Sequence, residues 1–269
     1  MVDLHKQIHD ILTNVDGVWG ICAKKLDNDE IIYEYNKDHE FSAASVNKIA
    51  IALYVFSQID QKLADPKEII TLVEENKLGG GVLYFLDAGL NLTLMDTVKL
   101  MLSISDNTAA KHLVKRFTPQ KINAYLETIG LKITQLEIEG DKFTFGNTTP
   151  LEMATILDGI YKSRYFSAEL CNTFLEIMKR DHNDLGIRRY LPEYISGQEN
   201  KLRVANKAGT IPGVRNDVSV VFDKEPYVLT IFANDLSDTI VNPDNKGVLA
   251  IAKISKIIYE SLNSASNTL

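Results

Sequence analysis

The sequence contains few cysteines, little proline or glycine, and no long apolar run. Its 269 residues include 2 Cys, 7 Pro and 15 Gly. This composition excludes a disulfide-stapled scaffold, a collagen-like chain and a low-complexity segment. Cys22 and Cys171 lie far apart in apolar stretches, which predicts two buried, unreactive thiols. A chain of this length buries enough surface to be stable without a disulfide or a metal.

The charge balance and the short apolar runs exclude two further classes of partner. Lys and Arg number 29 against 36 Asp and Glu, a net charge of −7, and no basic run is present, which argues against nucleic-acid binding. The longest apolar run, from Ile49 to Phe56, is much shorter than the roughly 20 residues of a membrane-spanning helix. No signal-peptide pattern opens the chain. We expect a cytoplasmic protein without a membrane partner. A secreted chain whose leader has been removed is the alternative.

The periodicity of apolar residues predicts helices in the middle of the chain and strands toward its two ends. The first part predicts a helix that carries Ile8, Ile11, Leu12 and Val15, followed by a hairpin with strands over 18–26 and 31–35. The middle predicts helices over 45–59, 93–103, 107–117, 119–129, 150–162 and 168–178. The last part predicts strands over 202–210, 218–222 and 227–233 and a helix that carries Val248, Ile251, Ile254, Ile258 and Leu262.

These elements predict an α+β fold in which one domain, residues 1–269, has two lobes. Tight turns between consecutive strands favour antiparallel pairing. Residues 1–44 and 195–269 form the predicted α/β lobe, a five-stranded antiparallel sheet flanked by the two terminal helices. Residues 45–194 form the other lobe, which is predicted to be all-α.

The start of the helix at 45–59 carries the first candidate for chemistry. Ser45 and Lys48 are three residues apart and therefore share one face of the helix. The free N–H groups and the positive dipole of a helix start favour an oxyanion at the amide of Ser45. The same field and an apolar environment lower the pKa of Lys48, which leaves a neutral amine able to take a proton from Ser45. An N-cap serine followed by a solvated lysine is the alternative interpretation.

Two further motifs are weak when each is taken alone. Ser105-Asp106-Asn107 has the composition of an ordinary helix cap, yet its hydroxyl and carboxamide suit a proton relay and a substrate contact. In Lys207-Ala208-Gly209-Thr210 a glycine at a strand end lets another backbone or a ligand approach, beside a cation that attracts an anionic substrate. A simple strand end is the alternative.

Taken together, the motifs Ser-x-x-Lys, Ser-Asp-Asn and Lys-x-Gly occur in an order that resembles the penicillin-recognising serine enzymes, above all the class A β-lactamases. The stretches Phe-Ser-Ala-Ala at 41–44, Thr-Thr-Pro at 148–150 and Val-Ala-Asn at 204–206 resemble the family as well. The resemblance extends from about residue 18 to the final helix. It implies the two-lobed β-lactamase and transpeptidase fold.

The resemblance also implies a role for each motif. Ser45 is the nucleophile that becomes acylated, Lys48 is its base partner, and Ser105 passes a proton to the leaving nitrogen. The second and third motifs hold the amide and carboxylate ends of the substrate, and the amides of Ser45 and Thr210 form an oxyanion hole. The implied substrate-binding residues are Asn107, Lys207, Gly209 and Thr210.

The sequence departs from the family at two places. Class A enzymes hold a glutamate for deacylation in a loop before the Thr-Thr-Pro stretch, but here that segment, residues 136–147, is shortened. It offers only Glu137 and Glu139, for which a solvated loop acid is the favoured interpretation. At Ala208 the family has a hydroxyl residue that meets the substrate carboxylate. Thr210 or Arg215 are the candidates to replace that contact.

The predicted function is a metal-free and cofactor-free serine hydrolase, resembling a β-lactamase, that acts through an acyl-enzyme on a small anionic amide or ester. We expect a monomer. A D,D-carboxypeptidase or esterase with poor β-lactam turnover and a penicillin-binding sensor are the alternatives. His5 and His9 have metal-ligand spacing but no third ligand in context, so a solvated helix edge is favoured for them.

Overall fold

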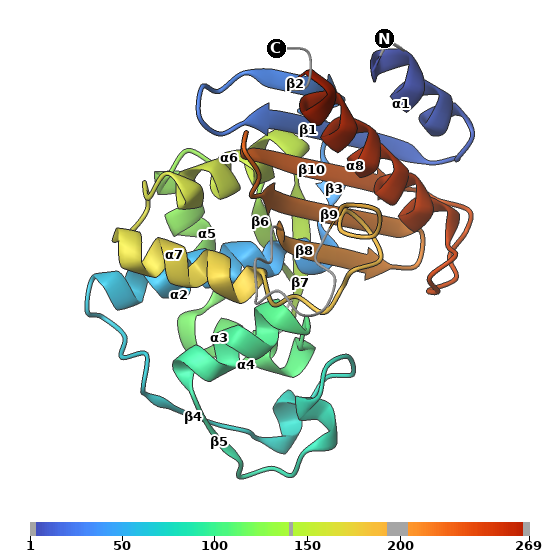
Figure 1. The fold of residues 1–269 in the computed structure, drawn as a ribbon. Coiled ribbons are helices and arrows are strands. Elements are labelled where there is room, and N and C mark those ends of the chain that lie inside the picture. Colours follow the sequence, from blue (N-terminus) through green and yellow to red (C-terminus); the bar gives the residue numbers. More distant parts are fainter. Residues whose placement is uncertain (1–3, 140–141, 193–203, 266–269) are drawn as a thin grey trace.

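A five-stranded antiparallel sheet forms the centre of one lobe (Figure 1). The computed structural model describes residues 4–139, 142–192 and 204–265. The strands follow the order β2-β1-β10-β9-β8, which confirms the predicted sheet. Their bounds are β1 Val18–Lys25, β2 Ile31–Tyr35, β8 Val204–Ile211, β9 Val214–Val221 and β10 Tyr227–Asn234. Residues 202 and 203 of the predicted strand lie outside the described residues, as does the predicted border between the lobes at 194 and 195.

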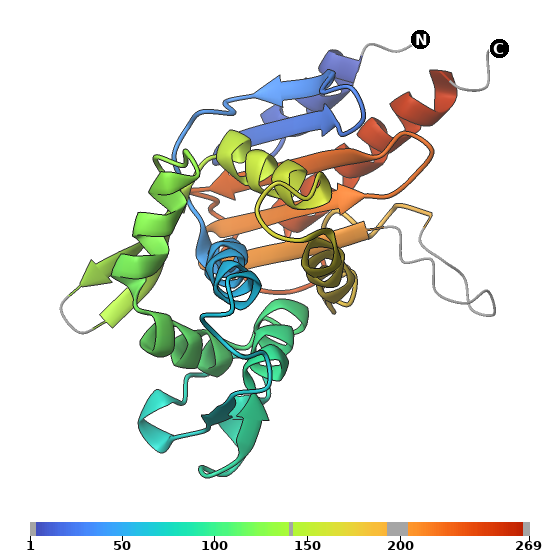
Figure 2. The same ribbon diagram turned by 90° about the vertical axis from the view of Figure 1, so that its left-hand side faces the viewer.

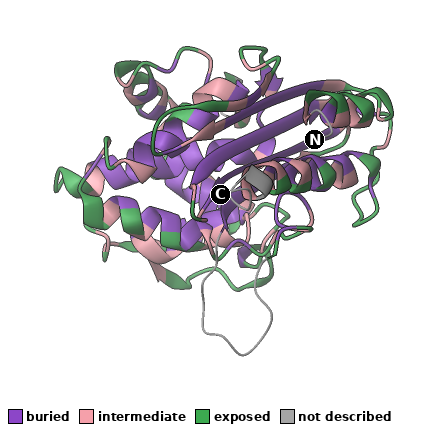
Figure 3. Ribbon diagram, turned by 45° about the horizontal axis from the view of Figure 1, so that its top comes forward, coloured by how far each residue is buried: buried purple, intermediate pink, exposed green. Residues whose placement is uncertain are grey.

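The two terminal helices, α1 (Leu4–Thr13) and α8 (Lys246–Ala265), cover one face of this sheet (Figure 2). Ile8 of α1 and Ile254 and Ile258 of α8 are fully buried against the apolar side chains of this face of the sheet. In Figure 3 the strands are buried between layers, whereas the outer sides of the helices are exposed. The apolar stripe of each terminal helix therefore holds it on the sheet.

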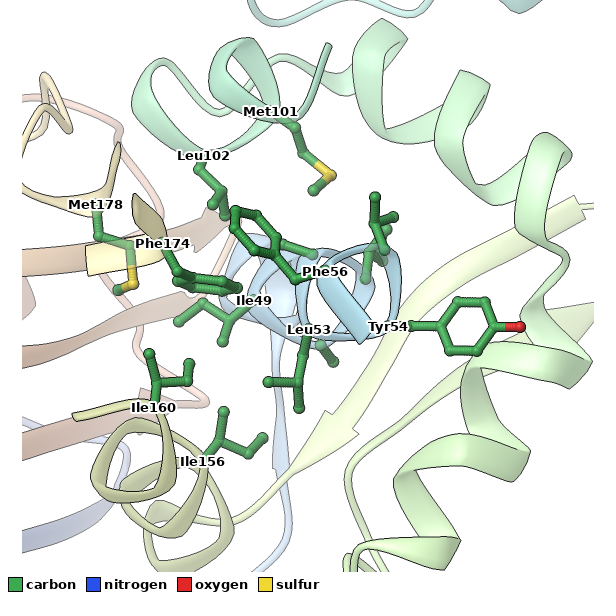
Figure 4. Packing of buried hydrophobic residues seen from close by; sticks show 14 of the residues in the cluster. Ile49, Leu53, Tyr54, Phe56, Met101, Leu102, Ile156, Ile160, Phe174 and Met178 are labelled. Atoms are coloured by element: carbon green, nitrogen blue, oxygen red, sulfur yellow. The ribbon is translucent and has the colours of Figure 1, made fainter. Parts of the chain in front are cut away.

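The helices of the second lobe surround α2, and α6 and α7 among them lie against the other face of the sheet. They are α2 Lys48–Asp60, α3 Leu94–Ser103, α4 Asn107–Phe117, α5 Pro119–Thr128, α6 Pro150–Tyr161 and α7 Ala168–Met178. Every residue of α2 from Lys48 to Ser57 is buried, because apolar side chains cover the helix all round. Figure 4 shows Phe56 of α2 among side chains of the neighbouring helices, with Met101 of α3 and Phe174 of α7 close by.

Two small sheets, which the sequence did not predict, take four of their five strands from the lobe predicted to be all-α. One joins β3 (Phe41–Ser42), β7 (Lys142–Thr148) and β6 (Gln135–Glu139), and the other pairs β4 (Ile69–Thr71) with β5 (Asn91–Thr93). Strands of two or three residues are too short to show an alternating pattern. The hairpin β6-β7 also contains a register shift between Gln135 and Glu137, which breaks its alternation.

The fold places the three sequence motifs at the junction of the two lobes. The edge strand β8 runs beside the short 3₁₀ turn η1 (Ala44–Asn47), which leads directly into α2. In residues 4–139, 142–192 and 204–265, no helix is long and apolar enough to cross a membrane.

Candidate active site

Ser45 lies in η1 rather than in the first turn of an α-helix. The preceding residue, Ala44, has φ +47°, a left-handed conformation that alanine rarely adopts and that is found most often at functional sites. Asn47, two residues after Ser45, is fully buried and anchors the turn to the β6-β7 hairpin. Its amide nitrogen donates to the carbonyl oxygens of Gln135 at 3.1 Å, Phe145 at 2.6 Å and Asn147 at 3.1 Å. Ser45 is therefore held on a turn that Asn47 fixes to the β6-β7 hairpin.

Lys48 opens α2 and is fully buried. Its amine nitrogen lies 2.5 Å from the carbonyl oxygen of Ser105, 2.6 Å from Oδ1 of Asn107 and 3.0 Å from Oγ of Ser105. Burial lowers the pKa of Lys48 to about 6, and the positive charge of Lys207 acts in the same direction. A neutral amine has two protons and one lone pair, which fits two carbonyl acceptors and one hydroxyl donor. Lys48 therefore suits the role of a base.

The Ser105-Asp106-Asn107 segment connects α3 to α4 and contacts the amine of Lys48 directly. Ser105 has φ +57°, which turns its side chain back toward Lys48. The buried carboxylate of Asp106 caps α4 through the amide of Ala109 at 2.9 Å. It also accepts from the amides of Val82 at 2.7 Å and Leu83 at 2.9 Å. Asp106 thus fixes the loop that follows the glycines at 79–81 to the Ser105-Asp106-Asn107 segment.

Residues 207–210 lie on β8, next to η1. A β carbon placed on Gly209 would lie 2.8 Å from the carbonyl oxygen of Ala43 and 3.1 Å from the amide nitrogen of Ser45, so only glycine allows this approach. Lys207 is 1% exposed and donates to the carbonyl oxygen of Ala208 at 2.9 Å. Burial lowers the pKa of Lys207, and the carboxylates of Asp181 and Asp217 oppose that shift.

One pocket of about 500 Å³ brings together segments that are far apart in the sequence. Of the predicted site residues, Ser45, Ser105, Asn107, Lys207 and Thr210 line it. The amine of Lys48 lies directly below, in contact with two of them. Among the described residues, the main-chain amide of Lys48 donates to the carbonyl oxygen of Ser45, but no hydrogen bond joins the hydroxyl of Ser45 to the amine of Lys48. The remaining wall is formed by Gly80, Gly81, Ile104, Asp181, His182, Asn183, Asp184, Leu185 and Ala208.

A model of the Beta-lactamase enzyme family matches residues 3–262, nearly the whole chain. The chain belongs to the Beta-lactamase enzyme family. It is a β-lactamase-like serine hydrolase, as its three motifs predict. A search of the curated proteins found no match.

Solved structures of this family share the fold over almost their full length. The β-lactamase from Sphaerobacter thermophilus DSM 20745 is 25% identical, with a TM-score of 0.84 and 97% of each chain covered. An ancestral class A β-lactamase is 22% identical, with a TM-score of 0.84 and coverage of 96% of this chain and 100% of that one. A point mutant of PBP-A, solved as an acyl-enzyme complex with penicillin-G, is 23% identical, with a TM-score of 0.84 and coverage of 97% and 96%.

The segment that precedes the Thr-Thr-Pro stretch differs from the loop that the family resemblance implies. It forms the β6-β7 hairpin, and the exposed carboxylate of Glu137 accepts hydrogen bonds from Thr144 and Asn147, both at 3.1 Å. The side chain of Glu139 lies outside the described residues. The hairpin instead presents Phe145 to the site, with the amine of Lys48 at 5.0 Å from the ring centroid. Glu137 is therefore not directed at the pocket.

Arg215, one of the two residues considered as a replacement for the missing hydroxyl at Ala208, is occupied elsewhere. Its guanidinium donates to four main-chain carbonyl oxygens, those of Ile211, Val214, Thr239 and Ile240, at 2.7–3.3 Å. Thr210, in contrast, lines the catalytic pocket. Of the two candidates, only Thr210 is placed to contact a substrate there.

Three residues near the site were missed by the sequence reasoning. Asn47 and Phe145 belong to no motif with a chemical role, and their positions depend on the packing of the hairpin. For Asp181 the only local signal in the sequence is that a polar residue follows the apolar helix α7. Gly80 and Gly81, from a run of glycines at 79–81, also form part of the pocket wall.

Proposed function

We propose that this protein hydrolyses β-lactams or similar small amides and esters through an acyl-enzyme on Ser45. The observation that carries the proposal is the buried amine of Lys48, with its pKa lowered to about 6, in contact with Ser105 beneath the pocket that Ser45 lines. At neutral pH this amine is unprotonated, so it can accept a proton.

Acylation uses the hydroxyl of Ser45 as nucleophile. Its oxygen forms a bond to the substrate carbonyl carbon while its proton passes to the amine of Lys48. The oxyanion that forms accepts hydrogen bonds from the amides of Ser45 and Thr210, which the close approach of β8 to η1 supports. When the carbon–nitrogen bond breaks, Lys48 returns the proton through Ser105 to the leaving nitrogen. No proton is gained or lost in this half-reaction.

Substrate recognition relies on Asn107 and Lys207. We assign the amide group of the substrate to Asn107, whose amide nitrogen donates one proton to the carbonyl oxygen of Gly79 at 2.7 Å and has a second to offer. The ammonium of Lys207 attracts the carboxylate end. Because Ala208 has no hydroxyl, this recognition depends on Lys207 and on Thr210.

Deacylation is the slower half-reaction in this proposal. A water molecule that attacks the acyl-enzyme needs a base, and on the hairpin side of Lys48 the ring of Phe145 occupies the space. Among the residues that the structure describes, the carboxylates that line the pocket are Asp181 and Asp184. The PBP-A relative, whose structure is an acyl-enzyme complex with penicillin-G, supports a stable intermediate on this fold.

Turnover of a chromogenic cephalosporin tests the proposal. We expect an initial burst of about one equivalent, then slower steady hydrolysis, as accumulation of an acyl-enzyme requires. Ser45→Ala should remove both phases. Ser103→Ala is the matched control, because this serine donates to the carbonyl oxygen of Ile177 at 3.4 Å instead of lining the pocket. Equal hydrolysis by the wild type and Ser45→Ala would refute the assignment of Ser45.

A further inference from the structure

Of the carboxylates that the structure describes on the loop after α7, Asp181 is the one that is both buried and part of the catalytic pocket. It is 5% exposed, and its neighbours along the loop, His182 and Asp184, are exposed. The loop is fixed at this point, because the amide of His182 donates to the carbonyl oxygen of Ser103 at 2.9 Å and Arg188 donates to the carbonyl oxygen of Asp181 at 2.7 Å. The position of Asp181 is therefore built into the fold.

The carboxylate of Asp181 is only half satisfied. Oδ1 accepts from the amide of Asn183 at 3.2 Å, whereas Oδ2 is buried without a full hydrogen bond in the part of the chain that the structure describes. The main-chain amide of Ala208, next to Lys207, also favours the charged form of this carboxylate. A buried, unpaired carboxylate oxygen is costly unless an opposite charge lies nearby. Burial raises the pKa of Asp181, and the charge of Lys207 is the largest effect in the opposite direction.

The ammonium of Lys207 needs a nearby negative charge to stay protonated in its buried position. Its side chain is almost fully buried in the wall of the pocket, and burial favours the neutral amine, which cannot hold an anion. The groups that act on its charge come from three elements: Lys48 from the start of α2, Asp217 from β9 and Asp181 from the loop after α7. Of the two carboxylates, Asp181 has the larger effect on Lys207 and is the one that lines the catalytic pocket.

We infer that Asp181 is a positioning residue that keeps the ammonium of Lys207 charged and thereby makes the enzyme select anionic substrates. The inference rests on the proposed function, in which Lys207 holds the carboxylate of the substrate. Asp181 does not touch the reacting atoms. It acts through Lys207, whose charge in turn disfavours a proton on Lys48 and so preserves the base.

The test compares acylation of Asp181→Asn and wild type by a penicillin and by the methyl ester of the same penicillin, between pH 6 and 9. The variant should lose about tenfold or more in kcat/KM for the carboxylate, mainly through KM, because a shift of one unit in the pKa of a group changes its charged fraction up to tenfold. The neutral ester should lose little. Removing the carboxylate lowers the pKa of Lys207 further, so the alkaline loss of activity with the anionic substrate should move to lower pH.

Three controls separate this role from a general loss of structure or of net charge. Asp10→Asn removes the same charge from an exposed position on α1, on the far side of the sheet, and should leave the preference for the anion unchanged. In a Lys207→Arg background, Asp181→Asn should no longer move the alkaline limb, because arginine stays charged without help. Asp181→Glu should retain most of the preference for the anion.

Equal losses for the two substrates would mean that Asp181 has only a structural role, and an unchanged preference for the anion would refute the inference as well. Persistence of the pH shift in the Lys207→Arg background would also overturn it. Failure of the proposed function has a different signature, since the wild type would then show no acylation of Ser45 by either substrate. If Asp181→Asn does not fold, Asp181→Ser, which also removes the carboxylate, replaces it in the wild-type and Lys207→Arg backgrounds, with the same expected and contradicting results.

Discussion

Replacing Lys48 by methionine should make the protein more stable while it removes the base. The free lysine has a pKa of 10.5, and burial lowers the pKa of Lys48 in the folded protein to about 6. Between these values the unfolded chain carries the proton and the folded chain does not, so folding must release it. At pH 7 this release costs about 5 kcal/mol of unfolding free energy.

Methionine has no proton to release, but it also loses the hydrogen bonds to the carbonyl oxygen of Ser105 and to Asn107. Each contributes about 1 kcal/mol, so we expect a net gain in the free energy of unfolding of about 2–3 kcal/mol at pH 7. Acylation should slow by about 10²–10⁴-fold, as loss of a positioned base does.

The sign of the pH dependence distinguishes this cause from better packing. The cost of releasing the proton is constant below pH 6, falls as pH rises and vanishes above 10.5. The free energy of unfolding of the wild type should therefore rise relative to that of Lys48→Met by about 1.4 kcal/mol for each pH unit between 7 and 9. Urea denaturation of both proteins at pH 7, 8 and 9 measures this difference in the free energy of unfolding. The other titrating groups are the same in the two proteins, so their contributions cancel. A difference that does not change with pH would refute a neutral Lys48.

Three further predictions follow from the geometry. Gly209→Val should lower the acylation rate at least about 100-fold, because a β carbon there forces β8 away from the amide of Ser45; a rate equal to wild type in a stopped-flow assay would contradict the close approach. Asn47→Ala should cost about 2–4 kcal/mol in urea denaturation, since three carbonyl oxygens of the β6-β7 hairpin lose their donor; a loss below about 0.5 kcal/mol would show that the anchor is dispensable. The wild-type acylation rate should fall about tenfold for each pH unit below 6 and level off above 7, as protonation of Lys48 removes the base; a flat profile from pH 5 to 8 would exclude Lys48 as that base.

Long amphipathic elements could be predicted from the sequence because their periodicity reflects burial directly. Helices α4 and α7 have the predicted bounds, and the sheet strands differ from the prediction mainly at their ends. The short strands of the β6-β7 hairpin were missed, since their pairing depends on contacts with Asn47 and with β3, residues far away in the sequence. Tertiary contacts of this kind leave no local pattern.

The part of the candidate site that belongs to sequence motifs could be predicted. Ser45, Ser105 and Lys207 meet in one pocket, as the order of the motifs predicted. The position of Phe145 beside Lys48 and that of Asp181 in the pocket that Lys207 also lines could not be predicted, because neither residue belongs to a motif. Each reaches the site through the path of a loop or hairpin that ordinary sequence reasoning treats as solvated surface.

The claim on which the whole account depends is that Ser45 becomes acylated. Rapid acid quenching of a reaction with penicillin, followed by proteolysis and peptide mass mapping, locates the added acyl group directly. The account predicts one adduct of the full penicillin mass on the peptide that contains Ser45, and none on that peptide in Ser45→Ala. An adduct on a different residue, or hydrolysis without any covalent intermediate, would contradict it.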